Sequence, residues 1–227
     1  MKLKLPVELK DESHDETRRH LLEAAGEVFA EGGFREATVR EICRRAGANI
    51  AAINYHFGDK ETLYLDVLRY AHGKALEKYP PLPGVTEDAP PEKKLRAFIH
   101  SLLLRIFDKG PTAWQGKVLL REMIEPTKAL DSLVEERMRP MVGLLWKIVA
   151  EILDCQVNDE RVRLCGFSIV SQCTFYKHCS PVVSRLFPDK LPQDAASIGH
   201  LADHITDFSL AAMKHFSAAK HRKHFCR

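Results

Sequence analysis

Apolar residues recur at spacings of three and four along most of the chain, which is the pattern of amphipathic helices. The first such stripe lies between Asp15 and Glu31 and ends at Gly32 and Gly33; it consists of Leu21, Leu22, Ala25, Val28 and Phe29. Further helices are predicted near residues 92–108, 112–124, 127–138, 140–154, 159–179 and 194–217. No segment shows the period of two that a half-buried strand needs, so the predicted fold class is all-α.

Two short helices are predicted directly after the first one. Thr38 can cap the first of them, and Glu41 three residues later completes a T-x-x-E capping box. Gly47 ends this helix, because glycine adopts the positive φ of a sharp turn without steric cost. Asn49 can cap the second, which reaches about residues 55–57.

Two short helices that meet at a glycine turn, the second too short to be stable alone, are typical of a helix-turn-helix. Ile42 and Ile53 are expected to fill the space between them, with Val39 and Phe57 at the edges. Gly58 and Asp59 then precede a fourth helix over about residues 60–78, and Asp59 can cap it.

Prolines divide the remaining helices into groups. Five of them fall within residues 80–91, a density that no helix accommodates. A second proline-rich segment, SPVVSRLFPDKLPQ, is predicted as a loop before the last helix. The predicted organisation is an N-terminal arm (1–13), a helix-turn-helix domain (14–78), a Pro-rich loop (79–91), a larger helical domain (92–217) and a basic tail (218–227).

Charge by itself does not identify a partner. The net charge is +3, and residues 1–79 hold 13 Lys or Arg against 14 Asp or Glu, so any nucleic-acid affinity must come from the placement of charges. No apolar run approaches the roughly 18 residues of a membrane span, and the N-terminus lacks a signal-peptide core. A cytoplasmic protein without a membrane partner is expected.

Chemistry of the catalytic kind is not indicated. P-loop, G-x-S-x-G and H-E-x-x-H motifs are absent from the sequence, so neither catalytic residues nor a cofactor are predicted. The six cysteines form no C-x-x-C pair and are expected to act as small buried side chains. Cys173, His178 and Cys179 are close in sequence, but their spacing matches no common zinc site, and no metal is expected.

The segment TVREICRRAGANIAAINYHFGDKETLYLDVL resembles the DNA-binding domain of TetR/AcrR-type transcriptional regulators. The family pattern reads roughly T-x-x-x-I-A-x-x-A-G-V-S-x-x-x-L-Y-x-H-F-x-x-K-x-x-L, and these residues match it: Thr38, Ile42, Ala46, Gly47, Ile53, His56, Phe57, Lys60 and Leu63. Cys43, Ala48 and Asn49 depart from the pattern but keep its local physics, whereas Asn54 stands where the family has Tyr. The clear resemblance covers residues 14–74, and GANIAAINYHFGDKETLY followed by an all-helical ligand domain is similar to the CecR-like branch.

The resemblance implies a transcriptional regulator that binds a double-stranded DNA operator. Contacts to phosphates are expected from Thr38, Arg40, Arg44, Arg45, Tyr55, His56 and Lys60. Contacts to bases are expected from Asn49, Ile50, Ala51, Ala52 and Asn54. Many relatives carry Lys where Ile50 stands, so shape and methyl contacts are expected to matter here. For the arginines, a solvated role without DNA contact stays open.

A homodimer is expected, because helix-turn-helix proteins gain affinity by binding two half-sites. The predicted interface combines the nearly all-apolar helix 159–179 with a stripe on the last helix, made of Ile198, Leu201, Ile205, Phe208 and Ala212. The alternative is that both helices pack only within the monomer.

The middle helices can enclose a small effector, expected to be mostly apolar with a few polar handles. The candidate lining residues are Trp114, Arg121, Met123, Trp146, Phe167, Gln172, Phe175 and Tyr176, and each can equally belong to the core. Such a ligand would favour a spacing of the DNA-binding domains that does not fit both half-sites, which releases a repressor. An activator on the same scaffold and a helical adaptor that binds protein are the alternative functions.

Overall fold

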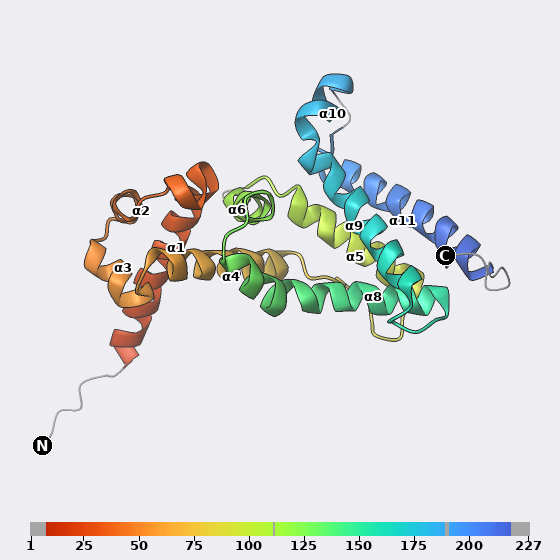
Figure 1. The fold of residues 1–227 in the computed structure, drawn as a ribbon, viewed down its shortest axis with the longest axis horizontal. Coiled ribbons are helices and arrows are strands. Elements are labelled where there is room, and N and C mark those ends of the chain that lie inside the picture. The colour runs from red at the N-terminus through yellow and green to blue at the C-terminus, as the bar shows by residue number, and fades with distance from the viewer. Residues whose placement is uncertain (1–7, 111, 189–190, 219–227) are drawn as a thin grey trace, which may run out of the picture. The chain divides into compact units, whose positions relative to one another are not determined.

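The computed structural model describes residues 8–110, 112–188 and 191–218, and all regular elements in these ranges are helical (Figure 1). The predicted all-α class is confirmed. Residues 1–7 of the predicted arm and 219–227 of the predicted tail lie outside the described ranges. Residues 8–13 belong to α1 (Glu8–Glu36), which begins earlier than predicted and leaves helical geometry at Gly33.

The chain divides into two compact units, each of which is described by itself. The first unit comprises the chain up to Ala75 together with Gly110–Arg137. Its elements are α1, α2 (Val39–Ala46), α3 (Ile50–Phe57), most of α4 (Lys60–Lys78), α6 (Ala113–Ile124), α7 (Ala129–Leu133) and most of the π-helical turn η1 (Val134–Met138). This grouping differs from the predicted boundaries, which assign residues 110–137 to the larger domain.

The core of the first unit combines α1 with α4 and the two short helices. The predicted stripe of α1 is buried, as are Ile42 and Ile53. On its other side α1 packs against α6, where the ring of Trp114 lies directly on Gly26. A Cβ at Gly26 would come within 2.1 Å of that ring, so only glycine permits this approach. The contact explains why α6 joins the helix-turn-helix rather than the other helices.

The second unit is a helical bundle built around α5. It comprises Leu76–Lys109 and the chain from Met138 onward, with α5 (Pro91–Ile106), α8 (Arg139–Leu153), α9 (Glu160–His178), α10 (Ser180–Leu186) and α11 (Ala195–Ala218). α5 packs against α8, α9 and α11 (Figure 1). Its Leu95, Ile99 and Leu103 are fully buried.

Two helix predictions needed correction. The segment predicted as a loop before the last helix contains α10, and Pro181 occupies its first turn, where a missing N–H leaves no hydrogen bond unmade. The single helix predicted over residues 127–138 is the short α7 followed by the turn η1.

Candidate DNA interface

Side-chain caps and one glycine fix the backbone of α2 and α3. Thr38 Oγ1 accepts the N–H of Glu41 at 3.2 Å, and Asn49 Oδ1 accepts the N–H of Ala52 at 2.9 Å. Between the helices Gly47 has a φ of 62°, although a Cβ there would meet nothing within 4 Å. Glycine is therefore required at this turn for its conformation and not for space. The predicted caps and turn are confirmed.

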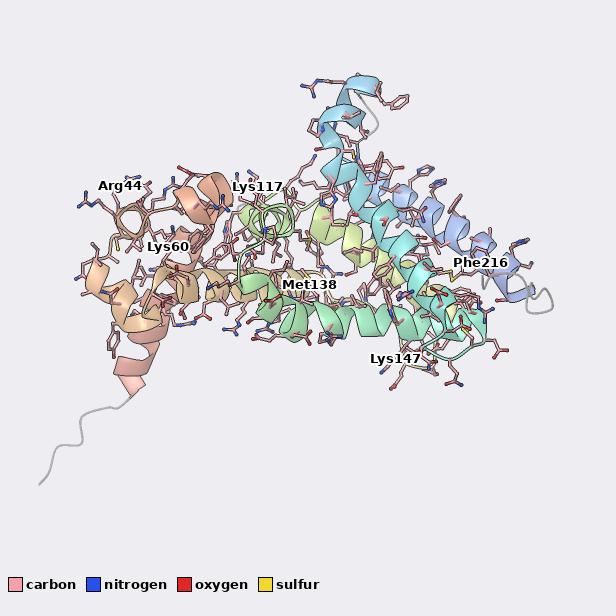
Figure 2. All side chains as sticks on the ribbon, in the orientation of Figure 1. Arg44, Lys60, Lys117, Met138, Lys147 and Phe216 are labelled. Atoms are coloured by element: carbon pink, nitrogen blue, oxygen red, sulfur yellow. The ribbon has the colours of Figure 1, made fainter. Side chains whose placement is uncertain are left out.

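Two of the three arginines of α2, Arg44 and Arg45, are held by acidic side chains. Glu41 does not bond back to the start of α2 as the predicted capping box requires; its carboxylate accepts Arg44 Nη2 at 2.7 Å and Arg45 Nε at 2.8 Å. These bonds lower the pKa of Glu41 to about 2. Arg45 also donates to Glu31 at 2.9 and 2.6 Å, which ties α2 to α1. Arg44 keeps 69% of its side chain exposed and projects outward from α2 (Figure 2), so a phosphate can still approach it.

The helix α3 buries one face and exposes the other. Ile53 and Phe57 point inward and are 1% and 5% exposed, whereas Ile50 and Tyr55 are 50% and 74% exposed. The Tyr55 ring meets the imidazole of His56 edge to face, with ring centres 5.2 Å apart. The outer face thus offers apolar and aromatic surface with little charge, as the sequence indicated.

The two asparagines near α3 differ in what they can still bind. Asn49 uses its Oδ1 for the cap, so a bidentate pair with adenine would break that cap. The side chain of Asn54 is exposed and makes no hydrogen bond to the described part of the chain. Asn54 is therefore the better candidate for reading a base edge.

The start of α4 is less open to an anion than the sequence indicated. Asp59 Oδ1 already accepts the N–H of Thr62 at 2.7 Å, and this bond lowers the pKa of Asp59. Lys60 is partly buried, with its Nζ 4.6 Å from the centre of the Phe34 ring. A phosphate near this end would meet the Lys60 ammonium beside a carboxylate.

Most of the predicted contact residues face solvent. Thr38, Arg40, Arg44, Asn49, Ile50, Ala51, Asn54 and Tyr55 are exposed, as is Arg45, and Ala52, His56 and Lys60 are partly buried. They lie on α2, on α3 or at the caps of these helices, except for Lys60, which begins α4. Their contact with DNA stays a prediction.

The predicted pocket residues belong to both units. Trp114, Arg121 and Met123 lie in the first unit, and the other five lie in the second. Trp146 packs on Gly166 as Trp114 packs on Gly26, so both indoles fill space against a helix backbone. Met123, Phe167 and Phe175 are about half exposed, whereas Gln172 and Tyr176 are partly buried. Arg121 lines a cavity in the first unit.

Three residues of the predicted dimer stripe are buried within the second unit. Ile198, Leu201 and Ile205 are 6%, 8% and 1% exposed and contribute to the core of the second unit, because α11 turns this side toward α5. Phe208 is 59% exposed and Ala212 is partly buried. Exposed apolar side chains follow α9 instead, at helical spacing: Leu164, Phe167 and Phe175.

Sequence reasoning missed a buried acid in the first unit. Glu122 is fully buried, and its carboxylate accepts the Tyr64 hydroxyl at 2.8 Å, the Thr127 N–H at 2.9 Å and the Thr127 hydroxyl at 3.0 Å. Burial and this bond raise the pKa of Tyr64. The two partners of Glu122 lie 58 and 5 residues away, so no local motif announces the cluster.

Neither metal-binding nor membrane-spanning features occur in the described ranges. They contain no group of three or more His, Cys, Asp or Glu side chains placed to hold a metal ion. Cys173 is buried, which raises the pKa of its thiol to about 12, while His178 is exposed. Among these residues no helix combines the length and the apolar character needed to cross a bilayer.

Family profiles match both parts of the sequence. Residues 21–67 match the profile described as bacterial regulatory proteins, tetR family, and residues 91–213 match that of the C-terminal domain of the HTH-type transcriptional dual regulator CecR. The CecR protein of Shigella flexneri is 31% identical over 172 residues, which cover 72% of this chain and 76% of that protein. The repressor AcnR of Corynebacterium glutamicum is 45% identical over 53 residues, 23% of this chain and 28% of its own length.

Solved structures share the fold at low sequence identity. A transcriptional regulator from Rhodococcus sp. Rha1 superposes with a TM-score of 0.64 at 20% identity, over 86% of this chain and 96% of its own. AibR in complex with isovaleryl coenzyme A and operator DNA gives a TM-score of 0.62 at 18% identity, over 85% of this chain and 97% of its own. The proteins named in these matches are regulators rather than enzymes.

Proposed function

Because the chain belongs to the TetR family of transcriptional regulators, and within it to the CecR-like proteins, we propose that it is a homodimeric repressor whose DNA binding a small effector relieves. The outer face of α3 carries the proposal. It is an eight-residue helix, capped at its start and followed by a glycine, that leaves Ile50, Asn54 and Tyr55 in solvent. A helix presented in this way can enter the major groove, where base edges are read.

The cations around α3 are placed for phosphates on either side of such a groove. Arg40 and Arg44 lie on the exposed side of α2, one helical turn apart, and Lys60 begins α4. These cations are few, and the carboxylates of Glu41 and Asp59 lie near them, so nonspecific affinity for DNA phosphates should be modest. The fit of α3 in the major groove should therefore contribute more of the binding.

Because α3 alone makes few DNA contacts, a homodimer that binds with two α3 helices is part of the proposal. Leu164, Phe167 and Phe175 on α9 and Phe208 on α11 are all more than half exposed. We propose that the two-fold partner covers these side chains, which gives two α3 helices on one operator. This proposal keeps the two helices and Phe208 that the sequence indicated, and it leaves out Ile198, Leu201 and Ile205, which are buried within the second unit.

The experiment begins with selection of bound fragments from genomic DNA, followed by footprinting and gel-shift titration. Tyr55→Ala and Lys60→Ala are expected to weaken DNA binding by about tenfold each, since each removes one contact to a DNA phosphate. Lys117→Ala, an exposed lysine of α6 (Figure 2), serves as the matched control and should bind like the wild type. Unchanged binding by both variants would reject the assigned face, and failure to select any DNA would favour a protein-binding adaptor.

Activation is the second candidate, because the relative from Shigella flexneri is described as a dual regulator. Transcription from the selected promoters, measured with and without the protein, separates the two modes. A footprint that overlaps the promoter core is expected for repression. The site of action in either case is the cytoplasm, where the DNA is accessible.

A further inference from the structure

A cavity of about 260 Å³ opens in the first unit, where the end of α1 meets α4 and the turn between α6 and α7. Its lining consists of Phe34, Arg35, Tyr64, Arg121, Glu125, Pro126 and Thr127. All of these residues belong to the first unit, so the cavity lies within the part of the chain that carries α2 and α3.

The buried acid Glu122 fixes two walls of this cavity. Its carboxylate accepts hydrogen bonds from Tyr64 and from both donors of Thr127 at 2.8 to 3.0 Å. Because all three donors come from lining residues, these walls hold their positions without a ligand. Preorganisation of this kind lowers the entropy that a ligand must lose on binding.

The charges of the lining favour an anion. Arg121 donates Nη2 to the carbonyl of Glu31 at 3.1 Å, while its Nη1 lies 4.0 Å from the largely exposed carboxylate of Glu125. The Arg35 side chain is exposed and forms no hydrogen bond to the described part of the chain. Two arginines therefore line the cavity with one loosely held carboxylate, while the Glu122 carboxylate behind the wall is already occupied by its three donors. Guanidinium groups bind carboxylates in a planar, bidentate manner.

The remaining wall is aromatic. The rings of Phe34 and Tyr64 lie 5.0 Å apart, and Phe34 is only partly buried. We propose that this cavity binds a small planar aromatic carboxylate, with its ring on Phe34 and its carboxylate between Arg35 and Arg121. The volume falls just below the usual range of ligand pockets, which limits the ligand to roughly ten to fifteen non-hydrogen atoms.

The cavity is directly connected to the candidate DNA interface. Phe34 also contacts the ammonium of Lys60, 4.6 Å from the ring centre. The Glu31 residue whose carbonyl binds Arg121 holds Arg45 of α2 through its carboxylate. A bound carboxylate would draw Arg121 away from the Glu31 carbonyl, and a bound ring would cover Phe34 and displace Lys60. Because both changes reach residues that hold the candidate DNA interface, the ligand weakens DNA binding. This consequence rests on the proposed function, whereas the binding site does not.

The test uses 2-naphthoate as the probe and 2-naphthamide as its neutral match, with affinities measured by isothermal titration calorimetry. Naphthoate is expected to bind at least about tenfold more tightly than the amide, and Arg35→Gln should remove that preference. Glu125→Gln should bind naphthoate about threefold more tightly, because a competing carboxylate is gone. Arg35 and Glu125 are exposed, so neither change threatens the fold, and Lys117→Gln on α6 is the control expected to match the wild type. Equal affinity for acid and amide, no binding of naphthoate, or an unaffected Arg35→Gln would overturn the proposal.

Gel shifts separate this proposal from the function it deepens. Saturating naphthoate should reduce DNA affinity at least about fivefold in the wild type and leave Arg35→Gln unaffected. If the protein without probe binds no DNA, the proposed function fails while the calorimetric result stands. If DNA binds normally but naphthoate changes nothing, the cavity is not an effector site.

Discussion

Both units leave apolar side chains in solvent, but on different scales. On α3, Ile50 and Tyr55 stand apart on an eight-residue helix between two glycines, with cations on the neighbouring helices. On α9, Leu164, Phe167 and Phe175 follow a 19-residue helix. The short face suits a groove of about 12 Å, whereas the long face suits another helix. Exposure alone is therefore ambiguous, and the length of the stripe and its flanking charges decide what it binds.

The largest expected effect comes from disrupting the proposed dimer interface, which consists of the long face of α9 and Phe208 of α11. Phe208→Glu places a charge in the proposed interface, so the dimer should dissociate and DNA affinity should fall about 100-fold through the loss of bivalent binding. Sedimentation velocity and gel shifts measure the two effects. Lys147→Gln, on an exposed position of α8 (Figure 2), lowers the net charge by the same one unit and is the control. A Phe208→Glu protein that stays dimeric would contradict the assigned face.

Shortening a side chain should lower protein stability on the inner face of α3 and change DNA preference on its outer face. Ile53→Ala removes a buried side chain and is expected to cost about 2–5 kcal/mol of unfolding free energy. Ile50→Ala removes an exposed one and should change stability by less than about 0.5 kcal/mol while altering which operators bind best. Urea denaturation and binding-site selection measure these outcomes. Similar losses of stability in both variants would mean that α3 does not have a free outer face.

The turn before α3 offers a comparison of two glycines. Neither Gly47 nor Gly73 has an atom within 4 Å of an added Cβ, but only Gly47 has a positive φ. Gly47→Ala should therefore destabilise the protein by about 1–2 kcal/mol, whereas Gly73→Ala, within α4, should stabilise it by about 0.5–1 kcal/mol. Thermal unfolding followed by circular dichroism distinguishes the signs. Equal effects would show that conformation is not what selects glycine at the turn.

The smallest expected effect concerns the ion pairs of α2. The pKa of Glu41 falls from 4.5 to about 2 on folding, so its contribution is present above pH 4.5 and is lost as the pH falls toward 2. Glu41→Gln should lower the melting temperature slightly at neutral pH and by less at pH about 3. Glu61→Gln, an exposed acid on α4, is the control and should show no such trend. A loss of melting temperature in Glu41→Gln that grows toward low pH would show that the ionised Glu41 carboxylate does not stabilise the fold.

The local elements of the DNA-binding region followed from the sequence alone. Thr38, Asn49 and Asp59 cap their helices and Gly47 turns the chain, because such interactions join residues only a few positions apart. Hydrophobic spacing likewise predicted most of the helices, though not α10, and the buried side of α1. A pattern of this kind determines that a helix forms and which of its sides is apolar.

Only the tertiary structure decided which partner covers each apolar side. Trp114 brings α6 onto Gly26 of α1, and α11 buries Ile198 and Ile205 against its own unit rather than offering them to a second copy. Glu122 finds Tyr64 across 58 residues of sequence. The physical reason is that the hydrophobic effect is non-directional, so an apolar stripe can be buried against any surface of complementary shape. Which surface covers it depends on how all the helices pack together.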